Sequence, residues 1–136
     1  MKFQQNDFTD DLKITIQHTE RVLKDYIEEL RADYQALLAK GNLALEVNFR
    51  KEGDDYFKPG SISSVTIGLL EKTDTYGVLI DIHTITLWEC ERIFLGIPIN
   101  KHVPESKVLG ELVDESVDEI KEELKEYLEE FIKEEA

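Results

Sequence analysis

Side chains that could carry out chemistry gather in one stretch of this 136-residue chain, DIHTITLWECERIF, from Asp81 to Phe94. The stretch holds His83, one of three histidines, and Cys90, the only cysteine. A thiol beside a histidine and a carboxylate is the arrangement of an activated nucleophile. Carboxylates and imidazoles are also metal ligands, and the residues available for that second chemistry are Asp81, His83, Glu89 and Glu91.

Strand geometry decides whether these groups can meet. In one extended strand, alternate side chains face opposite sides, so His83 and the carboxylates share a side while Trp88 and Cys90 lie on the other. A reversal through Ile85 and Thr86 would undo this separation, but that dipeptide is poorly suited to the positive φ of a two-residue turn. The candidate metal ligands would also extend over about 30 Å of straight strand. We therefore predict no catalytic residue and no cofactor, and retain as an alternative a ligand or metal site at Asp81, His83, Glu89 and Glu91.

Other residues of interest have simpler explanations. Asp54 and Asp55 lie in the loop KEGDDYFKPG, but their spacing lacks the D-x-[DN]-x-[DN]-G pattern of a calcium loop. His18 and His102 have no neighbour at ligand spacing, so both are expected to be surface residues. Large aromatic side chains are frequent anchors of protein interfaces. The aromatic residues that we predict to contact a partner are Trp88, Tyr56 and Phe57.

The chain contains no recognisable catalytic or nucleotide-binding motif. G-x-G-x-x-G, the P-loop pattern, H-E-x-x-H, G-x-S-x-G and C-x-x-C are all absent from the sequence. Together with the low number of histidines and cysteines, this favours a protein that is not an enzyme.

The elements around the stretch are clearest at the two ends of the chain. From Thr9 to Lys40, apolar residues recur at steps of three and four, which predicts one long amphipathic helix that ends at Gly41. A second helix is expected in the last segment, beginning near Pro104 or Ser106. Its apolar stripe would consist of Leu109, Leu112, Val113, Val117, Ile120, Leu124, Tyr127, Leu128, Phe131 and Ile132.

Between the helices the period of the pattern changes to two. NLALEVNFRK alternates apolar and polar residues, SISSVTIGLL predicts a second strand, and YGVLIDIHT a third. Residues 84–97 are either a fourth strand or the far half of one long bent strand. Because no helix separates consecutive strands, we predict a single α+β domain over residues 1–136. It would contain an antiparallel meander of three to four strands with both helices packed on one face.

Charge and composition limit the partners. With 30 acidic and 16 basic residues, the net charge of −14 repels phosphate backbones and anionic membranes, so no direct contact with nucleic acid or membrane is expected. The sequence shows no apolar run long enough to span a membrane, and its single cysteine cannot form an intrachain disulfide. These features predict a soluble cytoplasmic protein.

The acidic excess is concentrated near the end of the chain, where residues 105–136 hold 13 acidic and 4 basic residues. A protein-binding module, such as an inhibitor, an immunity-like protein or an adaptor, would use this pole to attract a basic partner. A homodimer through the long helices is compatible with this hypothesis. The rivals are the small-ligand or enzymatic domain described above and a mimic of nucleic acid. The acidic residues that we predict to contact the partner are Glu122, Glu126 and Glu130.

Overall fold

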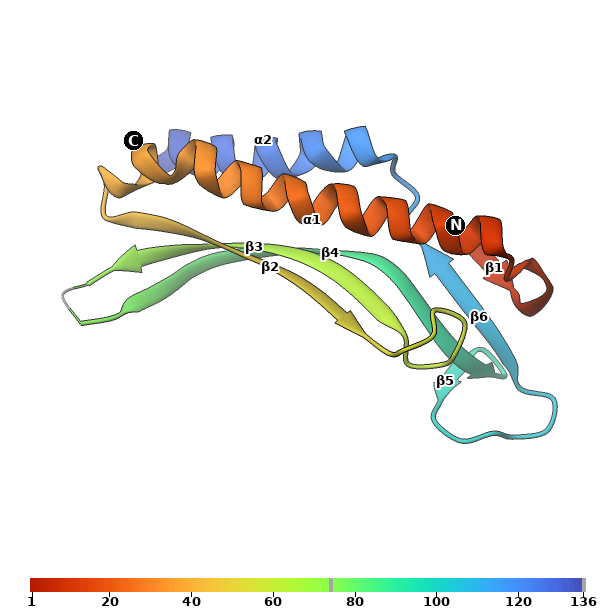
Figure 1. Cartoon of the computed structure of the whole chain (residues 1–136). Helices are drawn as coiled ribbons and strands as arrows, with labels where there is room; N and C mark the ends of the chain where they lie inside the picture. The colour runs from red at the N-terminus through yellow and green to blue at the C-terminus, as the bar shows by residue number, and fades with distance from the viewer. Residues whose placement is uncertain (74, 136) are drawn as a thin grey trace. The chain divides into compact units, whose positions relative to one another are not determined.

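The computed structural model describes residues 1–73 and 75–135, the last of these by its backbone alone. Within these residues it contains two α-helices, one short 3-10 helix and six strands (Figure 1). In chain order the elements are β1 (Lys2–Gln4), η1 (Gln5–Asp7), α1 (Asp10–Ala39), β2 (Leu43–Glu52), β3 (Ile62–Lys72), β4 (Gly77–Phe94), β5 (Ile97–Ile99), β6 (Lys107–Leu112) and α2 (Val117–Glu135).

The strands form one antiparallel sheet in the order β1-β6-β4-β3-β2, with β5 paired to the end of β4. The α+β class predicted from the sequence is confirmed, with a helix near each end of the chain. The described sheet has six strands, more than the predicted three to four. Strands β2, β3 and β4 follow one another both in sequence and in the sheet, whereas β1 and β6 add non-local pairs.

The chain divides into two compact units. Unit 1 consists of Met1–Arg21, Arg50–Ser64 and Thr86–Asp114, and unit 2 of Val22–Phe49, Val65–Ile85 and Glu115–Ala136. The single domain expected from the length of the chain stays a prediction. No helix in the described residues is long and apolar enough to cross a membrane.

Helix α1 begins and ends where the sequence predicted. The hydroxyl of Thr9 accepts a hydrogen bond from the Leu12 backbone N–H at 3.2 Å, so Thr9 caps the first turn. Thirty residues of regular helix follow. Its buried apolar positions lie one or two helical turns apart, at steps of three, four, seven or eight residues, as expected for an amphipathic helix: Leu12, Ile16, Leu23, Ile27, Leu30 and Leu38.

The predicted start of the last helix is wrong. Residues 107–112 form β6, and α2 begins at Val117 after the capping residue Ser116, whose hydroxyl accepts a hydrogen bond from the Glu119 N–H at 3.2 Å. In β6, Val108 and Leu112 are buried two residues either side of Gly110, which is the period of a strand and not of a helix.

Gly110 has a steric role opposite Trp88. A Cβ atom at this position would lie 2.1 Å from Cη2 of the Trp88 ring, a separation that real Cβ atoms essentially never show. Cys90, directly opposite Gly110 on β4, and Trp88, opposite Leu112, fix the register of the two strands. The absence of a side chain at Gly110 therefore makes room for the indole ring.

Residues 77–94 form one strand of 18 residues, so the chain does not reverse at Ile85 and Thr86. Side-chain contacts show that its alternation is interrupted. A Cβ at Gly68 would meet Leu79, while Thr66, two residues earlier on β3 and on the same face, contacts Thr84 through their hydroxyls at 2.9 Å. Leu79 and Thr84 cannot share a face in a regular strand, so β4 contains a bulge between them.

Candidate functional site

Trp88 and Cys90 belong to the core of unit 1. Both side chains are fully buried in a cluster with Leu12 and Ile16 of α1. The Trp88 ring is surrounded by three aromatic residues, with centroid distances of 6.2–6.3 Å, and its Nε1–H donates a 2.9 Å hydrogen bond to the carbonyl of Tyr56. The three aromatic residues are Phe3, Phe8 and Phe57.

This core contains all three aromatic residues that were predicted to contact a partner. Trp88 and Tyr56 are buried, and Phe57 is half-buried with its ring stacked on Phe8 at 4.7 Å. Their side chains stabilise unit 1 from within. None of the three is carried into the function proposed for the surface.

Cys90 does not have the surroundings of a reactive thiol. Burial, followed by the charges of Asp55 and Glu91, raises the pKa of the Cys90 thiol to about 11. A nucleophilic cysteine needs the opposite shift, because the thiolate is the reactive form. His83 lies in unit 2, whereas Cys90 lies in unit 1.

A buried polar cluster in unit 1 was not predicted from the sequence. The Tyr56 hydroxyl donates to Glu20 Oε1 and accepts from Lys51 Nζ at 2.7 Å, and this ammonium also lies 4.3 Å from the centroid of the Tyr56 ring. Glu20 is 5% exposed, and its Oε2 has no partner in the described residues. The available signal was position: Glu20 falls between Ile16 and Leu23 on the apolar stripe of α1.

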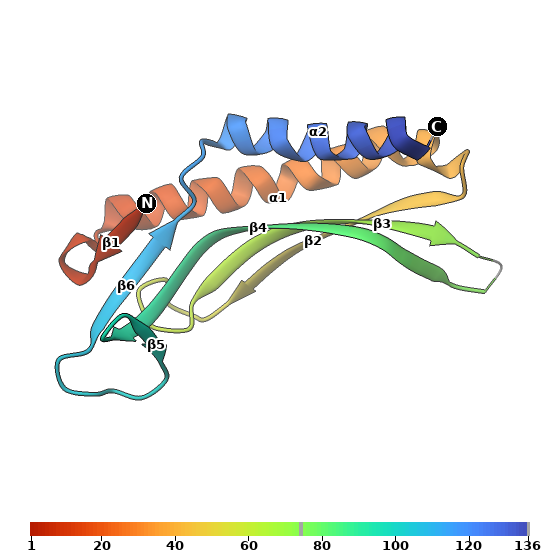
Figure 2. The ribbon, with the colours of Figure 1, turned by 180° about the vertical axis from the view of Figure 1, so that it is seen from behind.

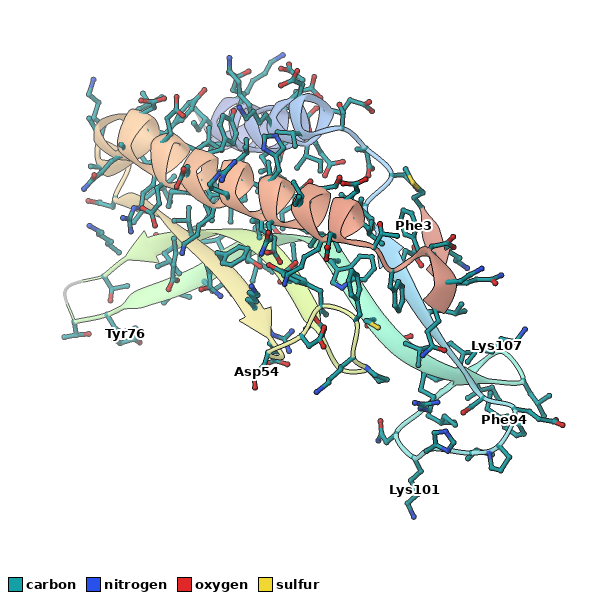
Figure 3. The ribbon with its side chains drawn as sticks, turned by 45° about the vertical axis from the view of Figure 1, so that its right-hand side comes forward. Phe3, Asp54, Tyr76, Phe94, Lys101 and Lys107 are labelled. Atoms are coloured by element: carbon teal, nitrogen blue, oxygen red, sulfur yellow. The ribbon has the colours of Figure 1, made fainter. Side chains whose placement is uncertain are left out.

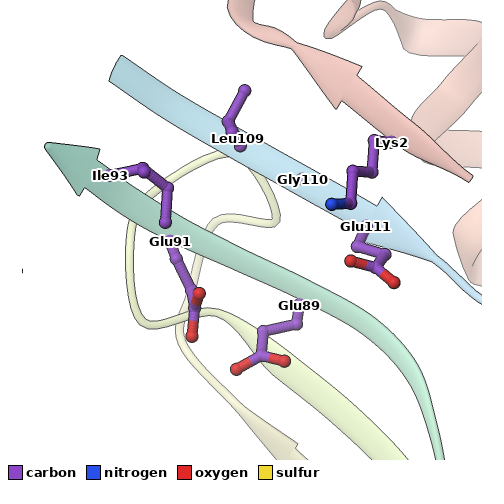
Figure 4. Close-up of a pocket in the computed structure, with 7 residues that line it drawn as sticks. All are labelled: Lys2, Glu89, Glu91, Ile93, Leu109, Gly110 and Glu111. Atoms are coloured by element: carbon purple, nitrogen blue, oxygen red, sulfur yellow. The ribbon is translucent and has the colours of Figure 1, made fainter. Parts of the chain in front are cut away.

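Glu89 and Glu91 line a small hollow on unit 1 with Glu111 of β6 (Figure 4). The two side chains project from the same side of β4, and Glu89 is directly opposite Glu111. A hydrogen bond with the Glu91 carboxyl group, then burial and the charges of Glu91 and Glu111, raise the pKa of Glu89. The hollow measures about 120 Å³, below the roughly 300 Å³ of typical ligand pockets.

Asp81 and His83 lie in unit 2 and contact α2. The His83 ring stacks on Tyr127 with a centroid distance of 4.8 Å, and its Nε2 is 3.2 Å from Glu123 Oε2. Burial of the Tyr127 hydroxyl, and then the nearby Asp81 carboxylate, raise the pKa of the phenol. The Tyr127 hydroxyl has no partner with hydrogen-bond geometry in the described residues.

The four residues of the alternative metal site are thus divided two and two between the units. In the described part of the chain, no group of three or more histidine, cysteine, aspartate or glutamate side chains is placed to hold a metal ion. Asp55 accepts a 2.9 Å hydrogen bond from the Phe57 backbone N–H, which is the contact of a loop-forming residue.

Helix α2 has two different polar sides. On one side it meets α1, where Glu129 accepts a 3.0 Å hydrogen bond from Tyr34 and Lys121 Nζ lies 5.3 Å from the centroid of the Tyr26 ring. Glu122 belongs to this side too, since its charge contributes to the raised pKa of Tyr26.

The other side of α2 carries a row of four exposed glutamates. It begins at Glu123, which contacts His83 of β4, and continues along the helix at steps of three, four and four residues, so the side chains are neighbours. The row contains no lysine. We refer to these residues as the acidic row: Glu123, Glu126, Glu130 and Glu134. It includes two of the three predicted acidic contact residues.

Comparison of the chain with protein-family models, with curated proteins and with solved structures found no match. Any function of the chain therefore has to follow from its own residues.

Proposed function

We propose that the chain is a non-enzymatic protein-binding module that attracts a basic partner through α2 and the adjacent part of β4. The observation that carries the proposal is the acidic row, four neighbouring exposed carboxylates with a single lysine, Lys133, at neighbouring spacing. Among the described residues no lysine or arginine forms a salt bridge with them, and only Glu123 is paired, with His83. Their field therefore extends into solvent and can accelerate the encounter with a positively charged surface. An inhibitor, an immunity-like protein or an adaptor would use such a surface.

Two further observations support a binding role over catalysis. The only thiol is buried with a raised pKa. Glu89, the carboxylate with a raised pKa in the hollow of unit 1, lines a space too small for an ordinary ligand. Burial of Trp88 and Tyr56 leaves the charged and apolar surface of unit 2 as the better contact region.

A pair of charge variants tests this proposal. Proteins retained by the immobilised chain at low salt would be identified and purified, and their dissociation constants measured by calorimetry at low and high salt. Removing two charges of the row with Glu126→Gln and Glu130→Gln should weaken binding by about 5- to 10-fold, since each exposed charge contributes up to about 1 kcal/mol.

The matched control removes two exposed carboxylates from the strands of unit 2 with Glu46→Gln and Glu71→Gln. It has the same change in net charge and should bind like the original chain. Equal losses in both variants would mean that net charge, and not the acidic row, governs binding. If no purified protein bound more weakly at high salt, the proposed function would be wrong.

A further inference from the structure

Besides the three-residue strand β5, the described part of the sheet has three open strand edges, and two of them are protected against pairing with another chain. β1 is three residues long. β2 carries four charged side chains among its ten residues: Glu46, Arg50, Lys51 and Glu52. Short length and charge are common devices that prevent an edge strand from adding a foreign strand.

The third edge has neither protection. β6 pairs with β4 only from Trp88 onward, so in the described chain no strand lies beside residues 77–86 on that side (Figure 2). We call residues 77–86 the β4 edge. Its sequence, GVLIDIHTIT, carries one formal charge, that of Asp81. Backbone N–H and C=O groups along this edge can therefore pair with an added strand, in which case the Ile82 N–H would exchange the 2.9 Å hydrogen bond that it now donates to Asp81 Oδ1.

Exposed apolar side chains accompany the free backbone groups. Leu79 is 52% exposed and Ile82 54%, and Val78 and Ile80 are exposed to a similar degree. Tyr76 extends this surface at the tip of the β3–β4 hairpin (Figure 3). A contiguous group of exposed apolar residues, unlike isolated ones, marks an interaction surface.

The bulge limits how a strand could be added. It falls between Leu79 and Thr84, and Asp81 and His83 both face α2, so regular alternation holds from Asp81 as far as Leu87, which is buried like its neighbour Trp88. The continuous run from Asp81 to Thr86 contains six residues, the length of an average strand. A partner segment of that length is sufficient.

The acidic row determines the chemistry of this segment. Glu123 and Tyr127 of α2 lie over the same residues, Asp81 and His83, that form the run. One face of an added strand would thus meet carboxylates, and the other face would lie on the side of Ile82. Successive side chains of a strand alternate between the two faces, so the complementary segment alternates basic and apolar residues.

Charge argues against a second copy of this chain at the β4 edge. A two-fold axis that continues the sheet through two antiparallel β4 edges places both α2 helices on the same face. The two acidic rows would then lie side by side, and like charges across an interface are unfavourable.

We propose that the β4 edge accepts an extended segment of a protein partner as an added strand, with Lys or Arg alternating with Val, Ile or similar apolar residues. This inference rests on the proposed function and adds the mode of binding. Backbone hydrogen bonds supply affinity, and the alternating side chains supply specificity.

Three capped synthetic peptides of about eight residues, longer than the six-residue run, separate charge from strand formation. One alternates lysine and valine, one lysine and glycine, and one glutamate and valine. Affinity is measured by fluorescence anisotropy and amide hydrogen exchange by mass spectrometry. The lysine–valine peptide alone should bind and slow exchange at residues 77–86 by tenfold or more.

Ile82→Lys and Ile97→Lys form a matched pair of variants. Both replace an exposed strand isoleucine, 54% and 63% exposed respectively, so both should fold, as circular dichroism would verify. A lysine at position 82 places a charge on the β4 edge and should lower the affinity for the lysine–valine peptide at least tenfold, whereas Ile97→Lys in β5 should leave it unchanged.

The other outcomes overturn the inference in distinguishable ways. Equal binding of the lysine–glycine peptide, without protection of residues 77–86, leaves the basic-partner module intact but excludes strand addition. Equal binding of the glutamate–valine peptide contradicts the acidic basis of both proposals. Protection that rises with protein concentration alone assigns the edge to a second copy, and no binding by the lysine–valine peptide also rejects the inference.

Discussion

Replacing Gly110 with alanine tests the packing that sets the register of β4 and β6. The φ of Gly110 lies outside the left-handed region, so any cost of the substitution comes from contact with the Trp88 ring. The new Cβ would lie 2.1, 2.6 and 3.0 Å from three atoms of the six-membered ring. Overpacking of a core costs about 1–3 kcal/mol, and displacement of the ring from the Tyr56 carbonyl adds about 1 kcal/mol. Alanine offsets about 0.5 kcal/mol by restricting the unfolded chain. We expect a net destabilisation of about 2 kcal/mol.

Urea unfolding followed by far-ultraviolet circular dichroism measures this change in the free energy of unfolding. A double-mutant cycle with Trp88→Phe identifies the cause, since phenylalanine lacks the ring atoms that the new Cβ would meet. In the Trp88→Phe background, Gly110→Ala should then lower the free energy of unfolding by less than about 0.5 kcal/mol, which is the usual deviation from additivity between independent sites. Gly41→Ala, whose Cβ would have no neighbour closer than 3.8 Å, is the control and should be nearly neutral. A near-neutral Gly110→Ala, or an equal cost in both backgrounds, would refute the reasoning.

Three further outcomes are expected. Leu95 is 84% exposed with φ 51°, and Leu95→Asn should raise the free energy of unfolding by about 0.5–1 kcal/mol in urea titrations, because asparagine tolerates this conformation at lower cost. Cys90, with a pKa of about 11, should have about one thiolate per thousand at pH 8 and be alkylated by iodoacetamide only on unfolding; rapid labelling of the folded chain would contradict its burial. Because the pKa of Glu89 is raised in the folded chain, this side chain contributes most to the free energy of unfolding below its unfolded pKa. That contribution is lost as pH rises through the folded pKa. Glu89→Gln should therefore stabilise the protein at neutral pH and reduce the decline in stability above about pH 4.5, the ordinary range of a glutamate; an unchanged pH profile would count against the carboxyl cluster.

Elements with an unambiguous period were predictable from the sequence. Helix α1 repeats its apolar residues over eight turns, and the alternation of β2 around Leu45 fits only a strand. Strand β6 was not predicted, because the spacing of Leu109, Leu112 and Val113 fits a helix equally well when the rest of the sheet is not known. Its assignment as a strand depends on pairing with β4, a non-local contact between residues about twenty positions apart. Gly110 inside the expected helix was the one local warning.

The candidate site was predictable only in part, for a related physical reason. The alternation of side chains along a strand predicted that His83 and Cys90 lie on opposite sides if the strand is continuous. The strand does continue through Ile85 and Thr86. The same argument put Asp81, His83, Glu89 and Glu91 together, because it assumed unbroken alternation. The consecutive burial of Leu87 and Trp88 shows that alternation is interrupted again between the two pairs, and such an interruption leaves no clear signal in the residues themselves. The acidic row required knowledge of which side of α2 contacts β4.

Trp88 is the only tryptophan, and its indole ring lies wholly within unit 1. Its intrinsic emission is therefore a reporter for one unit alone, while four of the five tyrosines, at positions 26, 34, 76 and 127, belong to unit 2. The tryptophan and these four tyrosines are therefore intrinsic spectroscopic probes of different units. Coincident tryptophan and near-ultraviolet tyrosine transitions would mean that α1, which runs through both units without a break, couples their unfolding into one cooperative event.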